Sequence, residues 1–103
     1  MNIFLPLSQL VSGKTLQLSG SKSESNRALL LQAFFPELQI KNLSTADDTL
    51  LLQRALQSKE TTIDIHHAGT AMRFLTAYFA TQVGREVLLT GSAMMKERPI
   101  HLL

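Results

Sequence analysis

The sequence predicts an α/β fold, in the broad sense that includes α+β, and two observations lead to this class. Segments that alternate polar and apolar residues, as half-buried strands do, are each followed by helix-forming residues, and this strand–helix pair occurs three times. The sequence also contains no low-complexity linker and no clean internal repeat. Because the chain has 103 residues, it has room for at most one small domain.

The first expected elements are two strands and a helix. Residues 3–10 are mostly apolar but contain a proline, which favours an edge strand, and residues 14–18 alternate as a strand does. A helix is expected over residues 23–35, which contain neither glycine nor proline. Ser21 and Glu24 have the spacing of a capping box, so this helix should begin directly after Ser21.

The middle of the chain repeats the pattern. Residues 38–43 alternate again and predict a strand. Thr45, with Asp48 three positions later, is expected to cap a helix over residues 47–58. A further strand is expected over residues 61–65, which are rich in threonine and isoleucine.

The last third predicts a helix over residues 70–82 and a strand over residues 86–90. Residues 96–103 resemble the beginning of a fourth helix, since Pro99 suits a first helical turn. A helix of about five residues is far shorter than the ~12–15 needed for marginal stability. We therefore expect the chain to be a piece of a larger protein.

Composition excludes several classes of function. The formal net charge is only +2 and the basic residues are scattered, which argues against a nucleic-acid surface. Cysteine is absent, and the neighbours His66 and His67 would point to opposite faces of a strand, so no metal site is expected. No apolar run approaches the ~20 residues of a membrane span, and no signal segment is recognisable, so a soluble cytoplasmic protein is expected.

The start of the first helix predicts an anion site. Lys22, Ser23 and Arg27 follow a glycine and a serine, and Ser23 and Arg27 stand one turn apart. Free N–H groups of the first turn add partial positive charge there, and the neighbouring serines and Asn26 add polar groups. A lone lysine–arginine pair is more often a solvated surface feature. Two cations at the positive end of a helix dipole are unfavourable without an anion, however, so we expect a phosphate or carboxylate.

Two later strand-to-helix junctions have the same chemistry. At the first, Gly69 leaves room for a ligand against the backbone, and Thr70 and Arg73 follow on the helix. At the second, a glycine-containing loop leads to Lys96 and Arg98. The planar fork of arginine binds two oxygens of a carboxylate or phosphate at once. Each junction alone fits a turn with a solvated cation, but three similar junctions favour a shared anion-binding role.

Three motifs resemble the N-terminal motifs of the 5-enolpyruvylshikimate-3-phosphate synthases and occur in the order of that family. They are Gly20-Ser21-Lys22-Ser23-x-Ser25-Asn26-Arg27, Ala68-Gly69-Thr70-Ala71-Met72-Arg73 and Lys96-Glu97-Arg98-Pro99-Ile100. The resemblance spans essentially the whole chain. Because family members are several-fold longer, it implies the N-terminal portion only.

The resemblance implies the enolpyruvyl transferase fold, which is called an α/β prism or inverted barrel. That fold has two domains, each built from three β-α-β-α-β-β units, of which this chain would hold only a part. Residues 1–19 would be strands of the first domain, and residues 20–103 would begin the second domain, which carries the substrate-binding motifs.

The implied activity is transfer of the enolpyruvyl group of phosphoenolpyruvate to the 5-hydroxyl of shikimate 3-phosphate, with release of phosphate. This is a step toward aromatic amino acids, and it uses no metal or cofactor. By resemblance, Lys22, Ser23 and Arg27 bind shikimate 3-phosphate. Lys22, Gly69 and Arg98 bind phosphoenolpyruvate, and the residues expected to support them are Arg73, His67 and Thr70.

The family's acid–base groups lie in its C-terminal part, so no catalytic residue is assigned in this chain. The chain alone is expected to be inactive and to need that part as its partner. Two alternatives remain. One is a relative of the UDP-N-acetylglucosamine enolpyruvyl transferases, whose lysine–asparagine pair and cysteine-bearing loop are not seen here. The other is a non-catalytic anion-binding or scaffold fragment of the same fold.

The chain also departs from the family pattern. The family usually has a small residue where His66 stands, asparagine where His67 stands, and often proline where Phe74 stands. The histidines change the size of the side chains next to Gly69.

Overall fold

Residues 2–99 are described by the computed structural model, and they form helices and a small parallel sheet. In chain order the elements are α1 (Lys22–Phe34), α2 (Asp47–Gln57), β1 (Thr62–Asp64), α3 (Gly69–Ala80), β2 (Leu88–Thr90) and α4 (Ala93–Lys96). Helices alternating with parallel strands are compatible with the predicted α/β class.

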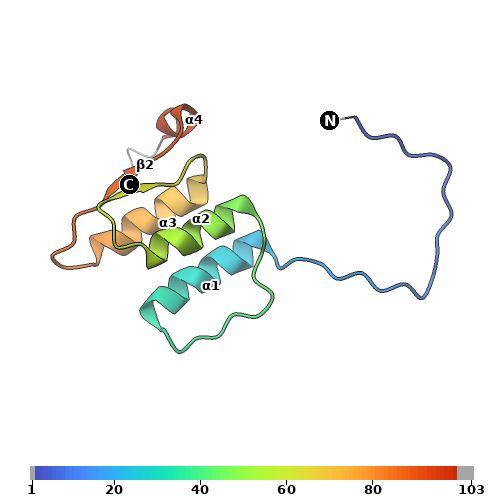
Figure 1. The fold of residues 1–103 in the computed structure, drawn as a ribbon, viewed down its shortest axis with the longest axis horizontal. Helices are drawn as coiled ribbons and strands as arrows, with labels where there is room; N and C mark the ends of the chain where they lie inside the picture. Colours follow the sequence, from blue (N-terminus) through green and yellow to red (C-terminus); the bar gives the residue numbers. More distant parts are fainter. Residues whose placement is uncertain (1, 100–103) are drawn as a thin grey trace.

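The three long helices pack side by side and run in the same direction, so their N-terminal ends lie at one end of the layer (Figure 1). The strands β1 and β2 pair in parallel, with Thr62 opposite Leu88 and Asp64 opposite Thr90. Helix α3 is the crossover between them, as a parallel pair requires. Because the strands run opposite to the helices, their carboxyl ends meet the helix N-termini at the same edge (Figure 1).

The hydrophobic core lies between the helices and the sheet. Its buried members come from all the elements except β2 and include the loop before α3. They are Leu29, Leu52, Ala55, Ile63, Ile65, Ala68, Ala71, Met72, Leu75, Phe79 and Met95. Full burial of one Leu or Ile side chain stabilises by about 1.5–3 kcal/mol, so this cluster holds the strand-to-helix loops in place.

Polar side chains at the start of α1 hold it against the segment that leads into α2. The hydroxyl of Thr49 donates to Oδ1 of Asn26 at 2.8 Å, and the N–H of Ser44 donates to Oγ of Ser25 at 2.9 Å. All four residues are buried. Ser25 and Asn26 therefore face inward and tie two elements together, whereas the sequence had suggested that they join the anion site.

The buried Thr49–Asn26 hydrogen bond gives a stability prediction. Thr49→Val keeps the shape of the side chain but removes the donor to Oδ1 of Asn26. Asn26 is only 1% exposed, so water cannot replace this donor. We expect a loss of roughly 1–3 kcal/mol in the free energy of unfolding, measured by urea titration. Thr81→Val, which removes an exposed hydroxyl, is the matched control and should cost less than about 0.5 kcal/mol. Equal unfolding midpoints for the two variants would contradict this role.

The strands expected over residues 3–10, 14–18 and 38–43 do not form within the described part of the chain. A strand needs a neighbour with which to exchange backbone hydrogen bonds, and within residues 2–99 the only paired strands are β1 and β2. Residues 18 and 42 meet only through the side-chain amide of Asn42, which donates to the carbonyl of Leu18. Residues 2–17 instead extend away from the helices, and side chains such as Leu7 and Leu10 are fully exposed. The assignment of residues 1–19 to another domain stays a prediction.

The starts of α1 and α2 were predicted correctly, whereas the cap of α2 and the start of α4 were not. Oγ of Ser21 accepts the N–H of Glu24 at 3.4 Å, as the capping spacing indicated. Thr45 does not cap α2, because the helix begins after Ala46. The N–H and the hydroxyl of Thr45 both donate to Oγ of Ser19 instead.

The fourth helix begins earlier than expected, at Ala93, because Ser92 supplies its cap. It ends before Pro99, since a residue that precedes proline is biased away from the helical conformation. The rest of the predicted fourth helix, residues 100–103, lies outside the described residues.

Candidate functional site

Four junctions gather at the edge where helix N-termini and strand ends meet. They are the loops that precede α1, α2, α3 and α4. In sheets with parallel strands, ligands bind outside the carboxyl ends of the strands, so this edge is where the fold positions a site. Most of the residues predicted to bind anions lie at the α1 and α3 junctions, and Arg98, which follows α4, reaches Gly69 at the α3 junction.

The α1 junction presents Lys22, Ser23 and Arg27 on an exposed surface. Nζ of Lys22 lies 3.7 Å from Oδ2 of Asp48 in the first turn of α2, with the lysine side chain 52% exposed. Such a solvated pair adds only about 0–1 kcal/mol to stability. Its effect is to hold the lysine between the starts of α1 and α2.

The first turn of α1 also has free backbone donors. The hydroxyl oxygen of Ser21 accepts the N–H of Glu24, and the carbonyl of Ser21 accepts the N–H of Ser25. Within residues 2–99, the N–H groups of Lys22 and Ser23 have no hydrogen-bond acceptor. These donors, the helix dipole and two cations all favour an anion at this point.

The α3 junction brings Gly69 and Arg98 together. A Cβ built on Gly69 would overlap Nη1 of Arg98 and lie 3.4 Å from its Cζ, so the guanidinium rests on the glycine. Gly69 is the first residue of α3, and Ala68 before it offers no side-chain cap. A cation at the uncapped positive end of a helix is unfavourable without an anion. An oxyanion that contacts the Arg98 guanidinium and the N-terminus of α3 would be stabilised by both groups.

Hydrogen bonds join the α3 and α4 junctions into one rim. The N–H of Ile65 donates to the carbonyl of Thr90 at 2.9 Å, and the N–H of Ser92 donates to the carbonyl of His66 at 2.8 Å. A Cβ on Gly91 would lie 2.6 Å from that His66 oxygen, so only glycine permits this approach. The loop that precedes α4 is therefore fixed against the loop that precedes α3.

A hollow of about 310 Å³ lies between α2 and the loop before α3. Its lining residues are Asp47, Leu50, Leu51, Arg54, His66 and His67. The hollow thus connects the start of α2 to the α3 junction, and it places His67 beside the predicted site. Arg54 was not singled out in the sequence, because a lone arginine in the last turn of a helix carries no spacing signal for a site.

The structure groups the predicted residues into two sets. Lys22, Ser23 and Arg27 share the α1 junction, and Gly69 and Arg98 share the α3 junction. Within residues 2–99, no hydrogen bond or ion pair joins one set to the other.

The supporting residues on α3 lie close to Gly69 in sequence. Thr70 is the second residue of the helix and is half-buried, whereas Arg73 is exposed one turn after Gly69. The roles of Thr70, Arg73 and His67 stay predictions.

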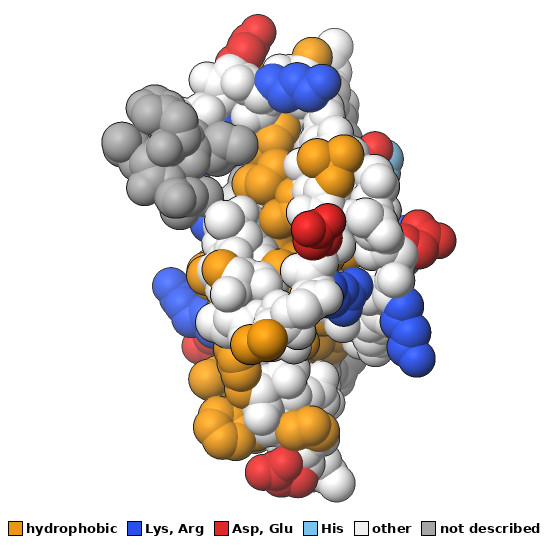
Figure 2. Space-filling view, turned by 90° about the vertical axis from the view of Figure 1, so that its left-hand side faces the viewer, with side chains coloured by type: hydrophobic (Ala, Val, Ile, Leu, Met, Phe, Trp, Pro, Cys, Tyr) orange, Lys and Arg blue, Asp and Glu red, His pale blue; other side chains and the backbone are white. Residues whose placement is uncertain are grey.

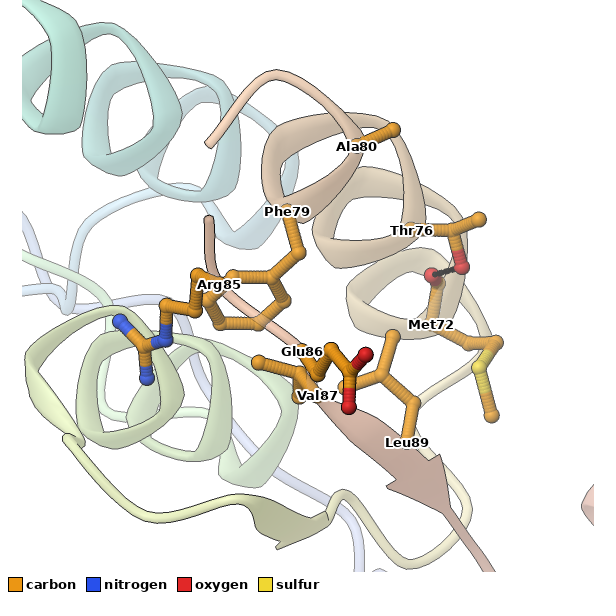
Figure 3. A pocket seen from close by; sticks show the side chains of 8 residues that line it. All are labelled: Met72, Thr76, Phe79, Ala80, Arg85, Glu86, Val87 and Leu89. Atoms are coloured by element: carbon orange, nitrogen blue, oxygen red, sulfur yellow. Dashed lines mark hydrogen bonds between the residues drawn. The ribbon is translucent and has the colours of Figure 1, made fainter. Parts of the chain in front are cut away.

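A larger hollow of about 590 Å³ lies between α3 and the segment that leads into β2, away from these junctions (Figure 3). Its lining is mainly apolar, and its arginine is already engaged: Arg85 extends along the ring of Phe79 at 4.8 Å and donates to the carbonyl of Ser58. This hollow therefore lacks the free cations that anionic substrates need.

The face at the C-terminal ends of the helices differs in chemistry from the junctions. Hydrophobic side chains gather there in a band, with lysine and arginine only scattered around it (Figure 2). Among residues 2–99, no group of three His, Cys, Asp or Glu side chains could hold a metal ion. No helix in this part of the chain is long and apolar enough to cross a membrane.

Comparison with known proteins gives one consistent family. The family model described as EPSP synthase (3-phosphoshikimate 1-carboxyvinyltransferase) matches residues 52–103. A 3-phosphoshikimate 1-carboxyvinyltransferase of Bacteroides fragilis is 47% identical over 90 residues, covering 86% of this chain and 22% of the relative. The enzyme of that name from Proteus mirabilis is 38% identical over 118 residues, covering 86% and 27%.

A third relative is a fusion protein. The pentafunctional AROM polypeptide 2 of Lodderomyces elongisporus is 40% identical over 115 residues, covering 82% of this chain and 7% of the relative. The chain thus spans about a fifth of the length of the first curated relatives that it matches. No solved structure matches the chain.

Proposed function

The chain belongs to the EPSP synthase (3-phosphoshikimate 1-carboxyvinyltransferase) family, and from this premise we propose that it forms one wall of the substrate site of such an enzyme. The proposed reaction transfers the enolpyruvyl group of phosphoenolpyruvate to the 5-hydroxyl of shikimate 3-phosphate and releases phosphate. The remainder of the enzyme is the proposed partner, because the chain spans only part of its relatives. A cytoplasmic location stays a prediction.

The placement of Arg98 on Gly69 carries this proposal. Phosphoenolpyruvate has a carboxylate and a phosphate, and a guanidinium fork at the N-terminus of α3 suits either group. The missing side chain of Gly69 leaves room for the Arg98 guanidinium at the N-terminus of α3, where an anion can contact both the guanidinium and the helix end. In this arrangement Arg98 orients phosphoenolpyruvate and balances its charge.

The α1 junction supplies the proposed site for shikimate 3-phosphate. Ser23 offers a hydroxyl and a free N–H, and Arg27 offers a fork one turn later on the same side. Lys22 lies at the edge of this junction nearest α2, held there by Asp48. From that position its flexible ammonium group is proposed to contact both substrates.

The contribution to catalysis is electrostatic and positional. The addition–elimination reaction joins two anions and passes through a tetrahedral intermediate that still carries their charge. Fixed cations that already point at this charge stabilise it without reorganisation. Holding the 5-hydroxyl against phosphoenolpyruvate lowers the barrier further by fixing the reacting atoms. The groups that move protons come from the remainder of the enzyme.

A chimera tests the proposed function. In it, this chain replaces the segment that it matches in the Bacteroides fragilis relative, with which it shares 47% identity over 90 residues. We expect phosphate release that requires both phosphoenolpyruvate and shikimate 3-phosphate, and no release by the isolated chain. A folded chimera that binds phosphate but never releases it from the two substrates would support the non-catalytic alternative.

Gly69→Ala in the chimera is expected to raise the KM for phosphoenolpyruvate roughly tenfold, while the KM for shikimate 3-phosphate changes less than about twofold. The added Cβ would overlap Nη1 of Arg98, so the guanidinium must move from the start of α3. Steady-state kinetics with each substrate varied in turn measures the effect. The control is Gly84→Ala, where a Cβ meets no atom within 4 Å but φ is +77°, so this variant carries backbone strain without displacing Arg98. Equal changes for both substrates would contradict the assignment of Gly69.

A further inference from the structure

His66 adopts a backbone conformation that its side chain disfavours. Its φ is +51°, in the left-handed region, where among residues 2–99 the only other non-glycine residue is Asn42. That region costs an ordinary residue roughly 1–2 kcal/mol. Histidine enters it more often than most residues but, unlike glycine, still carries a Cβ that opposes it. A histidine that stays there must be held by its surroundings.

The carboxylate of Asp64 supplies the hold. Its Oδ1 accepts the N–H of His66 at 2.8 Å, and it also lies 3.9 Å from Nδ1 of the His66 ring. Asp64 is the last residue of β1 and pairs with Thr90, so its backbone is fixed by the sheet. The carboxylate therefore anchors the left-handed turn to the strand.

The left-handed turn at His66 orients the segment that leads to Arg98. The carbonyl of His66 accepts the N–H of Ser92 at 2.8 Å, and Ser92 is the cap from which α4 begins. Helix α4 is a single turn that ends at Lys96, and Arg98 follows directly after its C-cap residue Glu97. A continuous set of contacts thus runs from Asp64 through His66 and Ser92 to the guanidinium on Gly69.

We propose that Asp64 is a positioning residue for the phosphoenolpyruvate half of the site: it holds His66 in the left-handed turn, and that turn sets the place of Arg98. The inference rests on the proposed function for its kinetic consequence. Asp64 contacts no substrate in this arrangement, since it acts through the backbone. Its loss should weaken phosphoenolpyruvate binding and leave shikimate 3-phosphate binding unchanged.

The test compares four variants of the chimera. Asp64→Ala should raise the KM for phosphoenolpyruvate roughly five- to tenfold, with the KM for shikimate 3-phosphate within about twofold of the parent. Asp64→Asn keeps an oxygen acceptor and should stay close to the parent. Adding His66→Gly to Asp64→Ala should restore the KM, because glycine adopts φ of +51° without help. Glu37→Ala, at an exposed turn, is the control for loss of a carboxylate.

Hydrogen–deuterium exchange provides a second readout that needs no turnover. The peptide containing Ser92 should exchange faster in Asp64→Ala than in the parent, and His66→Gly should reverse this. If the parent chimera lacks activity but the exchange pattern appears, the proposed function fails and the positioning role stands. If exchange at Ser92 is unchanged, if both KM values rise together, or if His66→Gly restores nothing, the inference is overturned.

Discussion

Replacing Arg98 by alanine in the chimera is expected to raise the KM for phosphoenolpyruvate about 100-fold. The guanidinium can form two charge-assisted hydrogen bonds to one oxyanion, and each such bond contributes roughly 1.5–3 kcal/mol. The side chain is exposed and rests on Gly69, so its removal should leave the core and the fold intact. Initial-rate kinetics with phosphoenolpyruvate varied at saturating shikimate 3-phosphate measures the effect.

Arg98→Lys separates charge from geometry. Lysine keeps the positive charge but cannot present two parallel donors, so an intermediate KM is expected. If Arg98→Ala and the parent have the same KM for phosphoenolpyruvate, Arg98 does not bind this substrate, whatever its distance from Gly69.

Lys22→Met and Arg27→Ala are each expected to weaken shikimate 3-phosphate binding by about 100-fold or more. Both side chains are exposed at the start of α1, where free N–H groups and the helix dipole already favour the phosphate. Isothermal titration of the chimera with shikimate 3-phosphate measures the affinity. Circular dichroism should show an unchanged helix content, because neither side chain contributes to the core.

Lys59→Met is the matched control for Lys22→Met. Lys59 is also an exposed lysine, but it follows the C-terminal end of α2, far along the helix layer from the α1 junction. Its replacement should leave the affinity for shikimate 3-phosphate within about twofold of the parent. Undiminished affinity in both Lys22→Met and Arg27→Ala would refute the assignment of the α1 junction.

The sequence allowed the long helices and the grouping of Ser23 with Arg27 to be predicted, because both depend on local spacing. Ser21 marked the start of α1, and the spacing of four residues from Ser23 to Arg27 places both on one side of this helix. The closeness of Gly69 and Arg98 followed from their shared junction type and from the resemblance, not from any local pattern. Nothing in the alternation of residues says which strands lie next to each other.

Other features required the three-dimensional structure. The alternating segment at residues 14–18 has the pattern of a strand, but no partner strand lies beside it within residues 2–99, so the pattern alone misled. Thr45 has a good capping spacing, yet Ser19 takes its hydrogen bonds. The left-handed turn at His66 was not predictable either, since such turns are read from glycine or asparagine and a histidine gives no such signal.

A crystal structure of the chimera with shikimate 3-phosphate and phosphoenolpyruvate bound would test the central claim most directly. We predict Nζ of Lys22 within hydrogen-bond distance of both ligands, the fork of Arg98 on phosphoenolpyruvate above Gly69, and Arg27 on the phosphate of shikimate 3-phosphate. Ligands bound away from the helix N-termini, or Lys22 and Arg98 facing separate cavities, would contradict the account.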